Sequence, residues 1–363
     1  MKKSRRVGIL GGGQLAKMLC DSGKKLNCET IILDPSSDSC GRFSANRHIE
    51  TEYHDKKGLK ELCENSDVIT YEFENVPSEI IDYLKEHNGN VPQGKKPLYL
   101  SQHRVREKEA VKKIGIKTAN FKSVKNLEEL KKAVHEIGYP AILKTCSGGY
   151  DGKGQWKMLE ERDLESIHLN ENVEYILEEM IGFDKEVSCL VVRGINGDIV
   201  SFPVGENIHK NGILNKTIVP ARLSQSILEK VEKISQEIIK NLDIYGPLGI
   251  EFFIKGDEIY FNEMAPRPHN SAHYTMDACN YSQFDIHLMG ILGEELPEIK
   301  LLTQVVMLNI MGEDEKKVKK LKKDKNTNVH IYGKSEWKKD RKMGHINYCG
   351  ENLEELILKA DSF

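Results

Sequence analysis

Short apolar runs alternate with helix-like segments along the first part of the chain. The runs at Arg6–Leu10, Thr30–Leu33 and Asp67–Thr70 have the length and composition of buried strands, and a helix is predicted after the first run, as far as Leu26. Because strands and helices that alternate in this way build parallel sheets, we expect a doubly wound, Rossmann-like domain over residues 1–102.

The pattern changes to helical spacing after this segment. The residues Leu98–Arg104 lead into a predicted amphipathic helix, and Leu127–Ile137 is predicted to be a second helix. That helix stops at Tyr139-Pro140, because proline cannot continue a helix. We expect a smaller α/β domain over residues 103–184.

The remaining segment, residues 185–363, favours a mostly antiparallel sheet with helical cover. One long amphipathic helix separates two pairs of strand-like runs. The runs are Val187–Val192 and Ile199–Pro203 before the helix Ser226–Leu242, and Leu248–Ile254 and Glu258–Asn262 after it. A small terminal subdomain is expected from about residue 300. The pattern as a whole predicts a multidomain protein of the α/β and α+β classes.

The composition limits the kinds of partner. The 363 residues suit two or three domains, and a net charge of -3 with 30% charged residues gives no bias toward nucleic acid or membranes. Seven lysines occur within Glu313–Lys325, and we interpret this stretch as an exposed helix or loop, because no aromatic residues interleave with the lysines as they do in nucleic-acid sites.

Cysteine usage and the start of the chain indicate the compartment. The eight cysteines include no Cys-x-x-Cys pair and no regular spacing, which predicts neither a zinc site nor a disulfide framework. The basic start is followed by only a short apolar run before three glycines interrupt it. We therefore expect a protein of the reducing cytoplasm, with no signal peptide and no membrane span.

A glycine turn follows the first predicted strand. The stretch Gly11-Gly-Gly13-Gln-Leu-Ala16 fits G-x-G-x-x-A, and Asp34 ends the second strand where a ribose-binding acid would lie in a dinucleotide site. Taken alone, this predicts an NAD-dependent dehydrogenase. Any phosphate-bearing ligand could use the same backbone donors, and a purely structural tight turn would also require glycine.

A second glycine-rich segment lies beside a lysine. The predicted strand Pro140-Ala-Ile-Leu-Lys144 is followed by Ser147-Gly-Gly-Tyr-Asp-Gly-Lys-Gly-Gln155. A fixed cation beside a flap of backbone donors suits a bound triphosphate, although the spacing is not that of a Walker motif. A flexible loop with an incidental lysine is the alternative.

Two acidic residues occur in otherwise apolar predicted strands. With a three-residue turn at Lys255-Gly-Asp257, Glu251 would pair with Phe261, and Glu263 would lie on the same face of the sheet. Two buried carboxylates on one face need a cation between them, and oxygen ligands together with ATP point to Mg2+. The alternative is one acid paired with a lysine and the other solvated.

Taken together, these motifs resemble the ATP-grasp superfamily and, within it, the 5-(carboxyamino)imidazole ribonucleotide synthases. The likeness runs from about Val7 to His345. Its most specific stretches are Asp67-Val-Ile-Thr-Tyr-Glu-Phe-Glu-Asn-Val76, Gly149-Tyr-Asp-Gly-Lys-Gly-Gln155, Glu206-Asn-Ile-His209, Asn262-Glu-Met-Ala-Pro-Arg-Pro-His-Asn-Ser271, Ser282-Gln-Phe284 and Arg341-Lys-Met-Gly-His345.

The resemblance implies an ATP-grasp fold with a bound ATP and Mg2+. The residues that would bind ATP are Arg104 and Lys144 at the phosphates, the flap residues Gly149, Tyr150, Asp151, Gly152, Lys153, Gly154 and Gln155, the adenine-reading segment Glu178, Glu179, Met180 and Ile181, Glu186 at the ribose, and His209, Asn262 and Glu263. Glu251 and Glu263, helped by Asn262, would hold Mg2+.

The resemblance also implies a second substrate, 5-aminoimidazole ribonucleotide. Its site would be made by Gly13, Gln14, Leu15, Glu74, Tyr150, Asp151, Arg267, Lys334 and Arg341, with Lys334 and Arg341 at its phosphate. In the implied reaction, bicarbonate attacks the ATP γ-phosphate to give carboxyphosphate, and the amine of the ribonucleotide takes the carboxyl group. Arg267 and Lys144 would be the catalytic cations. The family operates in purine biosynthesis and usually forms homodimers.

Other functions stay open on the sequence. A formate-dependent glycinamide ribonucleotide transformylase would share the acid pair, although Tyr71-Glu-Phe-Glu-Asn75 and the Arg-Lys-Met-Gly-His segment favour the first assignment. A nucleotide-binding scaffold without catalysis is another alternative. The chain departs from the family pattern at Ala272, where glycine is expected, at His103, where Asp is usual, and at Cys146-Ser147, where Arg is frequent.

Overall fold

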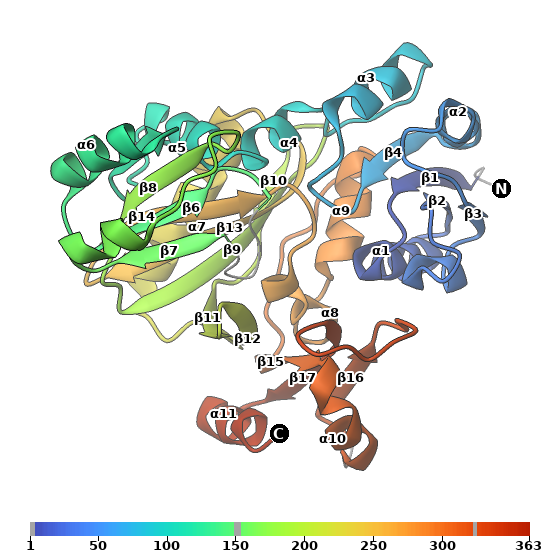
Figure 1. The fold of residues 1–363 in the computed structure, drawn as a ribbon. Helices are drawn as coiled ribbons and strands as arrows, with labels where there is room; N and C mark the ends of the chain where they lie inside the picture. Colours follow the sequence, from blue (N-terminus) through green and yellow to red (C-terminus); the bar gives the residue numbers. More distant parts are fainter. Residues whose placement is uncertain (1–3, 149–153, 322–324) are drawn as a thin grey trace.

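A parallel four-stranded sheet occupies the N-terminal part of this computed structural model, which describes residues 4–148, 154–321 and 325–363 (Figure 1). Its strand order is β3-β2-β1-β4, and β1 pairs in parallel with both of its neighbours. The strands are β1 (Arg5–Leu10), β2 (Cys28–Leu33), β3 (Arg47–Ile49) and β4 (Val68–Tyr71), and the helices are α1 (Gln14–Lys25), η1 (Cys40–Phe43), α2 (Lys56–Asn65), α3 (Ser78–Glu86) and α4 (Lys96–Ser101). The parallel sheet predicted from the sequence is confirmed.

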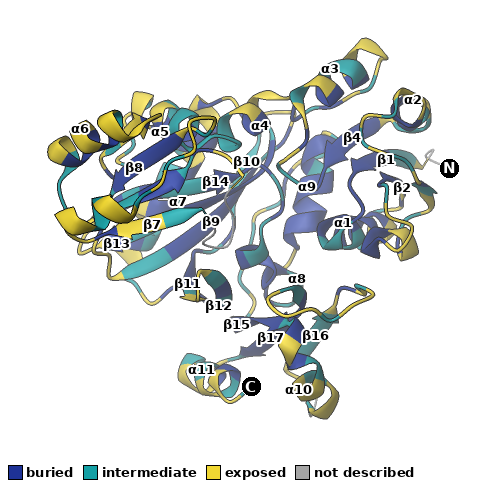
Figure 2. Ribbon diagram, in the orientation of Figure 1, coloured by how far each residue is buried: buried dark blue, intermediate teal, exposed yellow. Residues whose placement is uncertain are grey.

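Apolar residues on one side of β1 pack against α1 and the helix α9 (Gln283–Ile291). Val7 and Ile9 are fully buried against α1, in a core that also contains Phe284 and Leu288 of α9. Figure 2 shows α9 as a buried helix, whereas α3 and α6 have exposed outer faces. The N-terminal sheet is therefore attached to the rest of the molecule through a shared hydrophobic core.

A smaller antiparallel sheet follows, in the order β5-β8-β6-β7. Its helix α6 (Leu127–Ile137) has the predicted bounds, because Asn126 caps the first turn through Glu129 N at 2.9 Å, and Gly138 ends the helix at a positive φ of 82°. The other elements are α5 (Arg104–Lys113), β5 (Phe121–Val124), β6 (Ala141–Thr145), β7 (Gln155–Met158), η2 (Glu161–Ser166) and β8 (Tyr175–Glu179).

The helix α5 corrects one expectation. It was predicted to be amphipathic, yet its buried residues are Glu107, Lys108 and Val111. The sequence of this helix is almost entirely charged, so the apolar spacing carries little information about which side is buried.

A nine-stranded sheet forms the largest unit, and the mostly antiparallel arrangement is confirmed. The order is β14-β13-β9-β11-β12-β15-β17-β16, with β10 beside β9. The strands are β9 (Lys185–Arg193), β10 (Ile199–Ser201), β11 (Gly205–Lys210), β12 (Ile213–Val219), β13 (Gly246–Lys255), β14 (Glu258–Ala265), β15 (Gln304–Met311), β16 (Thr327–Ile331) and β17 (Lys342–Gly350). The helices are α7 (Gln225–Asn241), η3 (Asn270–Ala272), α8 (Thr275–Ala278), α9, η4 (Gly312–Asp314), α10 (Glu315–Lys320) and α11 (Leu353–Asp361).

The hairpin of β13 and β14 differs from the predicted register. Lys255 pairs with Glu258, so the turn has two residues rather than three, and Gly256 adopts the positive φ of 57° that such a turn favours. A β-bulge then shifts the register, and Glu251 pairs directly with Glu263 instead of Phe261. The predicted common face is confirmed, because residues directly opposite in a sheet point to the same side.

Three smaller observations concern the lysine-rich stretch, the cysteines and the length of the helices. The helix α10 in the lysine-rich stretch buries none of its residues, and residues 322–324 of that stretch lie outside the described residues. All eight cysteines are buried and free. None of the helices in the described parts of the chain is long and apolar enough to cross a membrane. The domain boundaries stay a prediction.

Candidate functional site

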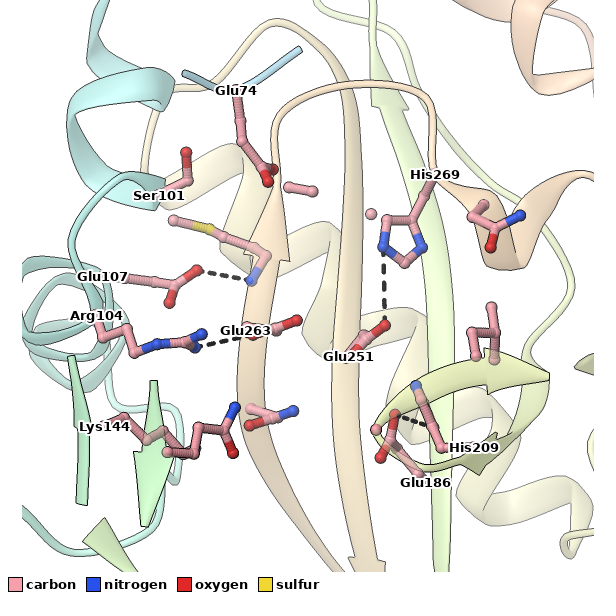
Figure 3. A pocket seen from close by; sticks show the side chains of 18 of the residues that line it. Glu74, Ser101, Arg104, Glu107, Lys144, Glu186, His209, Glu251, Glu263 and His269 are labelled. Atoms are coloured by element: carbon pink, nitrogen blue, oxygen red, sulfur yellow. Dashed lines mark hydrogen bonds and ion pairs between the residues drawn. The ribbon is translucent and has the colours of Figure 1, made fainter. Parts of the chain in front are cut away.

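A cavity of about 770 Å³ lies where the smaller sheet faces β13 and β14, and the glycine loop before α1 borders it. Figure 3 shows Arg104 and Lys144 approaching the acids of β13 and β14 from the side of the smaller sheet. The cavity is lined by most of the predicted site residues: Gly13, Gln14, Leu15, Glu74, Arg104, Lys144, Gln155, Glu178, Glu179, Met180, Ile181, Glu186, His209, Glu251, Asn262, Glu263 and Arg267.

Some predicted residues do not line this cavity. Lys334, Arg341 and Gly154 are absent from its wall, and Gly149, Tyr150, Asp151, Gly152 and Lys153 lie outside the described residues. Of the predicted flap Gly149–Gln155, only Gly154 and Gln155 are therefore placed.

Three carboxylates come together at the floor of the cavity. Burial and the charges of Glu263 and Glu186 raise the pKa of Glu251 well above its ordinary value. Burial and Glu263 raise the pKa of Glu186 to about 8, and its Oε1 makes no hydrogen bond although His209 Nδ1 lies 3.4 Å away. Burial and mutual repulsion thus disfavour the charged forms of Glu251 and Glu186 in the ligand-free site.

Glu263 has an arginine as its partner. Its carboxylate accepts a hydrogen bond from Arg104 Nη1 at 3.0 Å and keeps 44% of its side chain accessible, because it borders the cavity. Burial acts to raise the pKa of Glu263, but the charge and hydrogen bond of Arg104, together with the charges of Lys144 and Lys108, lower it. The alternative in which an acid of this pair is held by a lysine is wrong for Glu263, whose ion pair is with Arg104.

Lys144 lies in a second cluster, with Glu178 and Lys108. Lys144 Nζ is 2.8 Å from Glu178 Oε2, Lys108 Nζ is 3.5 Å from Oε1, and Lys108 also donates to the Asn262 carbonyl at 3.0 Å. Burial acts to raise the pKa of Glu178, but the two lysines together hold it at about 2. The side chain of Glu178 therefore holds the two lysines in place, and Glu178 also lines the cavity.

The glycine loop has its polar positions filled by the protein itself. Glu72 accepts hydrogen bonds from Gly13 N and Ala16 N, the latter at 2.8 Å. Asp34 Oδ2 accepts from Gly12 N at 2.8 Å and from the Tyr53 hydroxyl at 2.7 Å. A dinucleotide would need the N–H groups of the loop for its pyrophosphate and Asp34 for its ribose. Because these groups already have protein partners, the interpretation as an NAD-dependent dehydrogenase is wrong.

Lys334 and Arg341 lie beside η1, which packs on the glycine loop. Lys334 Nζ donates to the Lys342 carbonyl at 2.7 Å, and Arg341 Nη1 donates to the Glu336 carbonyl at 3.3 Å. Burial lowers the pKa of Lys334 to about 8, and the charge of Arg341 acts in the same direction. The charges of both side chains act to lower the pKa of Cys40 in η1. Both residues, which belong to the C-terminal part of the chain, therefore lie near the N-terminal sheet.

Several residues around the site were not singled out from the sequence. Glu107 lines the cavity and accepts from Met264 N at 2.7 Å, and burial raises its pKa to about 8. His269, Asn270 and Lys342 also line the cavity. His269, Asn270 and Lys342 lie in quoted motifs and could have been found from them, whereas Glu107 carries no signal apart from its charge.

The departures from the family pattern fit the local backbone. Ala272 is buried in η3 and is not among the described residues with positive φ, so no glycine is needed there. His103 caps α5 by accepting from Arg106 N at 3.5 Å and lies 2.9 Å from Glu174. The carbonyl of the buried Cys146 accepts from Arg104 N at 2.9 Å.

Sheets arranged in this way, around a cavity that contains cations suited to bind phosphate and a pair of acids, define an ATP-grasp enzyme. Profiles of known families match in the same order: a ribonucleotide synthetase preATP-grasp domain at residues 2–102, an ATP-grasp domain at 109–284, and a phosphoribosylaminoimidazole carboxylase C-terminal domain at 305–359. The chain belongs to the family of N5-carboxyaminoimidazole ribonucleotide synthases, ATP-dependent ligases of purine biosynthesis.

Individual relatives are similar over nearly the whole length. The Bacillus subtilis N5-carboxyaminoimidazole ribonucleotide synthase is 43% identical over 97% of this chain and 93% of its own, and that of Staphylococcus aureus is 44% identical over 98% and 95%. The Staphylococcus aureus synthetase complexed with ADP is 41% identical with a TM-score of 0.93, covering 100% of this chain and 97% of its own. The Aspergillus clavatus enzyme in complex with ADP and 5-aminoimidazole ribonucleotide is 28% identical with a TM-score of 0.90, covering 100% of both chains.

Proposed function

We propose that this chain uses ATP and bicarbonate to carboxylate 5-aminoimidazole ribonucleotide, with N5-carboxyaminoimidazole ribonucleotide, ADP and phosphate as products. One observation supports this most directly. The same cavity is bordered by Lys144, which is suited to bind phosphate, by the acid pair of β13 and β14, and by the glycine loop of the N-terminal sheet. A relative of the same fold holds ADP and the aminoimidazole ribonucleotide together. The geometry thus supports a ligase that brings a nucleotide triphosphate and a ribonucleotide to one place.

ATP is proposed to lie between the smaller sheet and β13 and β14. Arg104 and Lys144 are proposed to bind its phosphates, because both present their cationic groups at the cavity, where a polyanion can replace their present carboxylate partners. The backbone of Glu178–Ile181 is proposed to read the adenine, with Glu186 and His209 near the ribose. The flap Gly149–Gln155, of which residues 149–153 lie outside the described residues, is proposed to close over the phosphates on the resemblance to the family.

Mg2+ is proposed to be held by Glu251 and Glu263, assisted by Asn262. The fit rests on their direct cross-strand pairing and on the raised pKa of Glu251, which burial and the neighbouring carboxylates cause and which a divalent cation would offset. Within the described residues, no group of three or more His, Cys, Asp or Glu side chains could hold a metal ion alone. A bound Mg2+ would supply charge neutralisation at the phosphates and would need ATP oxygens to complete its ligands.

The chemistry is proposed to occur in two steps. An oxygen of bicarbonate attacks the γ-phosphorus of ATP, the bond to the β-γ bridging oxygen breaks, and ADP and carboxyphosphate result. The exocyclic amine of the ribonucleotide then attacks the carboxyl carbon, directly or after CO2 is released, and phosphate leaves while the amine loses a proton. Arg267, held 3.1 Å from Glu74, is proposed to face the oxyanions, and Lys144 to offset charge on the transferred group.

The ribonucleotide is proposed to lie between the glycine loop and Arg267. Gly13, Gln14, Leu15 and Glu74 border the cavity on this side, and Lys334 and Arg341 are proposed to take its phosphate. Tyr150 and Asp151 keep their predicted roles as proposals. A homodimer and a location in the cytoplasm are also proposed, on the resemblance to the family.

Phosphate release tests this function. We expect release from ATP that requires bicarbonate and rises strongly when 5-aminoimidazole ribonucleotide is added. Glycinamide ribonucleotide with formate should not replace these substrates, and if it does, the transformylase alternative is the better one. Release that is indifferent to the aminoimidazole ribonucleotide would contradict the substrate assignment, even if ATP is hydrolysed.

A further inference from the structure

The glycine loop before α1 is closed by a carboxylate from another part of the sheet. The helix α1 has 12 residues, no acidic residue in its first turn and no side-chain cap of its own at Gly13. Glu72, immediately after β4, instead accepts hydrogen bonds from Gly13 N with Oε1 and from Ala16 N with Oε2, at 2.8 Å for the second. Both carboxylate oxygens are thus used on the backbone donors of one helix end.

The glycines of the loop are explained by this carboxylate. A Cβ at Gly13 would lie 2.7 Å from Glu72 Oε1, and at Gly11, which has a φ of +105°, a Cβ would collide with the Glu72 side chain. The close approach that glycines usually give a ligand phosphate is here given to a protein side chain. Glu72 is 7% exposed and borders the cavity together with Gly13.

Glu72 interacts electrostatically with cations at both proposed ends of the ribonucleotide. The charge of Arg267, at the proposed reaction side, acts to lower the pKa of Glu72. The charge of Glu72 acts to raise the pKa of Lys334, at the proposed phosphate side. A second anion at this helix end would meet the carboxylate of Glu72 in a buried setting, where like charges repel strongly. The loop is therefore suited to uncharged parts of a ligand.

We propose that Glu72 is a positioning residue that sets ligand specificity by taking the place of a ligand phosphate at the N-terminus of α1. The loop Gly11–Leu15 is thereby held ready for the ribose and imidazole of the ribonucleotide, and the ligand phosphate is directed to Lys334 and Arg341. Dinucleotides are excluded by the same carboxylate. The identity of the ribonucleotide rests on the proposed function, whereas the filling of the helix end does not.

Chemical rescue with acetate tests the proposal, because Glu72→Ala deletes a group equivalent to acetate and leaves the donors Gly13 N and Ala16 N facing an opening. In Glu72→Ala we expect KM for the ribonucleotide to rise about tenfold, as for loss of a hydrogen bond to a charged group, while KM for ATP stays within about twofold. Acetate should lower the raised KM and raise the melting temperature of the variant. Chloride at equal ionic strength should do neither.

Glu72→Gln is the matched variant, since it fills the same space but turns an N–H group toward an N–H donor. We expect the same rise of KM without rescue by acetate, and this variant also serves if Glu72→Ala does not fold. Glu79→Ala, an exposed acid in the following helix, controls for general effects of acetate.

The outcomes separate the two proposals. An unchanged KM in Glu72→Ala, or equal acetate effects in Glu72→Gln or Glu79→Ala, would overturn the role of Glu72. If the wild-type protein does not use the ribonucleotide at all, the proposed function fails. The acetate-dependent melting temperature of Glu72→Ala then still decides whether the carboxylate fills the helix end.

Discussion

Replacing Lys108 with methionine tests how the phosphate-binding side of the cavity is held together. Lys108 is 2% exposed, and its ammonium group lies 3.5 Å from Glu178 and 3.0 Å from the Asn262 carbonyl. Methionine keeps most of the volume and removes the charge. Glu178 then keeps only Lys144 as a close cation, so the variant measures what the second lysine contributes.

The magnitude follows from the pKa of Glu178. The ordinary value is 4.5 and the folded value about 2, which corresponds to about 3 kcal/mol in favour of the charged form. Lys144 retains part of this, and burial lowers the pKa of Lys108, so removing that lysine also relieves a desolvation cost. We expect a net loss of about 2 kcal/mol, less than the full cost of breaking a buried pair, because Glu178 is still paired.

The pH dependence has a defined sign. A carboxyl whose pKa is lowered on folding adds stability above its unfolded value of 4.5, and this stability is lost as the pH falls toward about 2. The difference between wild type and Lys108→Met should therefore be largest above pH 4.5 and shrink in acid.

Thermal unfolding measures the effect in the ligand-free protein. A loss of about 2 kcal/mol should lower the melting temperature by roughly 4 to 8 °C for a cooperative unit of 150–250 residues. Lys113→Met, at an exposed position of the same helix, should change it little. The double variant Lys108→Met/Glu178→Gln should be more stable than the sum of the single changes predicts, because each single change already removes the Lys108–Glu178 interaction and the double variant loses it only once. Strictly additive losses would refute the reasoning.

Three further predictions concern the acids and the arginine of the cavity. Glu251→Gln should keep or raise the melting temperature, because repulsion already raises the pKa of Glu251, while phosphate release should fall at least about 100-fold; an unstable variant would contradict this. Because the pKa of Glu186 is raised to about 8, the neutral form of this carboxyl contributes stability. This contribution is complete below pH 4.5 and is lost as the pH rises through about 8. Unfolding of the ligand-free protein should show this decline, and a rise of stability over that range would be evidence against it. Arg267→Ala should lower kcat more than it weakens ATP binding, measured by phosphate release and calorimetry, and equal losses would count against a role at the transferred group.

The sequence was most informative where short-range physics decides the structure. The alternation of apolar runs predicted the parallel N-terminal sheet, and the bounds of Leu127–Ile137 followed from a capping asparagine and a terminating glycine. The acids of the hairpin were assigned to one face, although the pairing partner was wrong. The two-residue turn and a β-bulge together decided that partner, and the bulge depends on how the whole sheet packs.

The site itself was predictable as a set of residues but not as an arrangement. Lys144, Glu251 and Glu263 stand out because charges in apolar strands need a reason. The buried pair Glu107 and Lys108 does not stand out, because in a helix made almost entirely of charged residues only tertiary contacts select which of them are buried.

The glycine loop shows most clearly what each level determines. The spacing Gly11-Gly-Gly13 by itself fixed a tight turn at the start of a helix, since only glycine allows such a backbone and such close approach. What approaches the loop was decided by the fold, which brings Glu72 from the end of β4, 59 residues from Gly13, onto the helix end. Local sequence sets backbone conformation, whereas long-range packing decides which groups lie next to a polar group. In this protein the neighbour is Glu72, and for that reason a loop with the spacing of a dinucleotide site is part of a ligase.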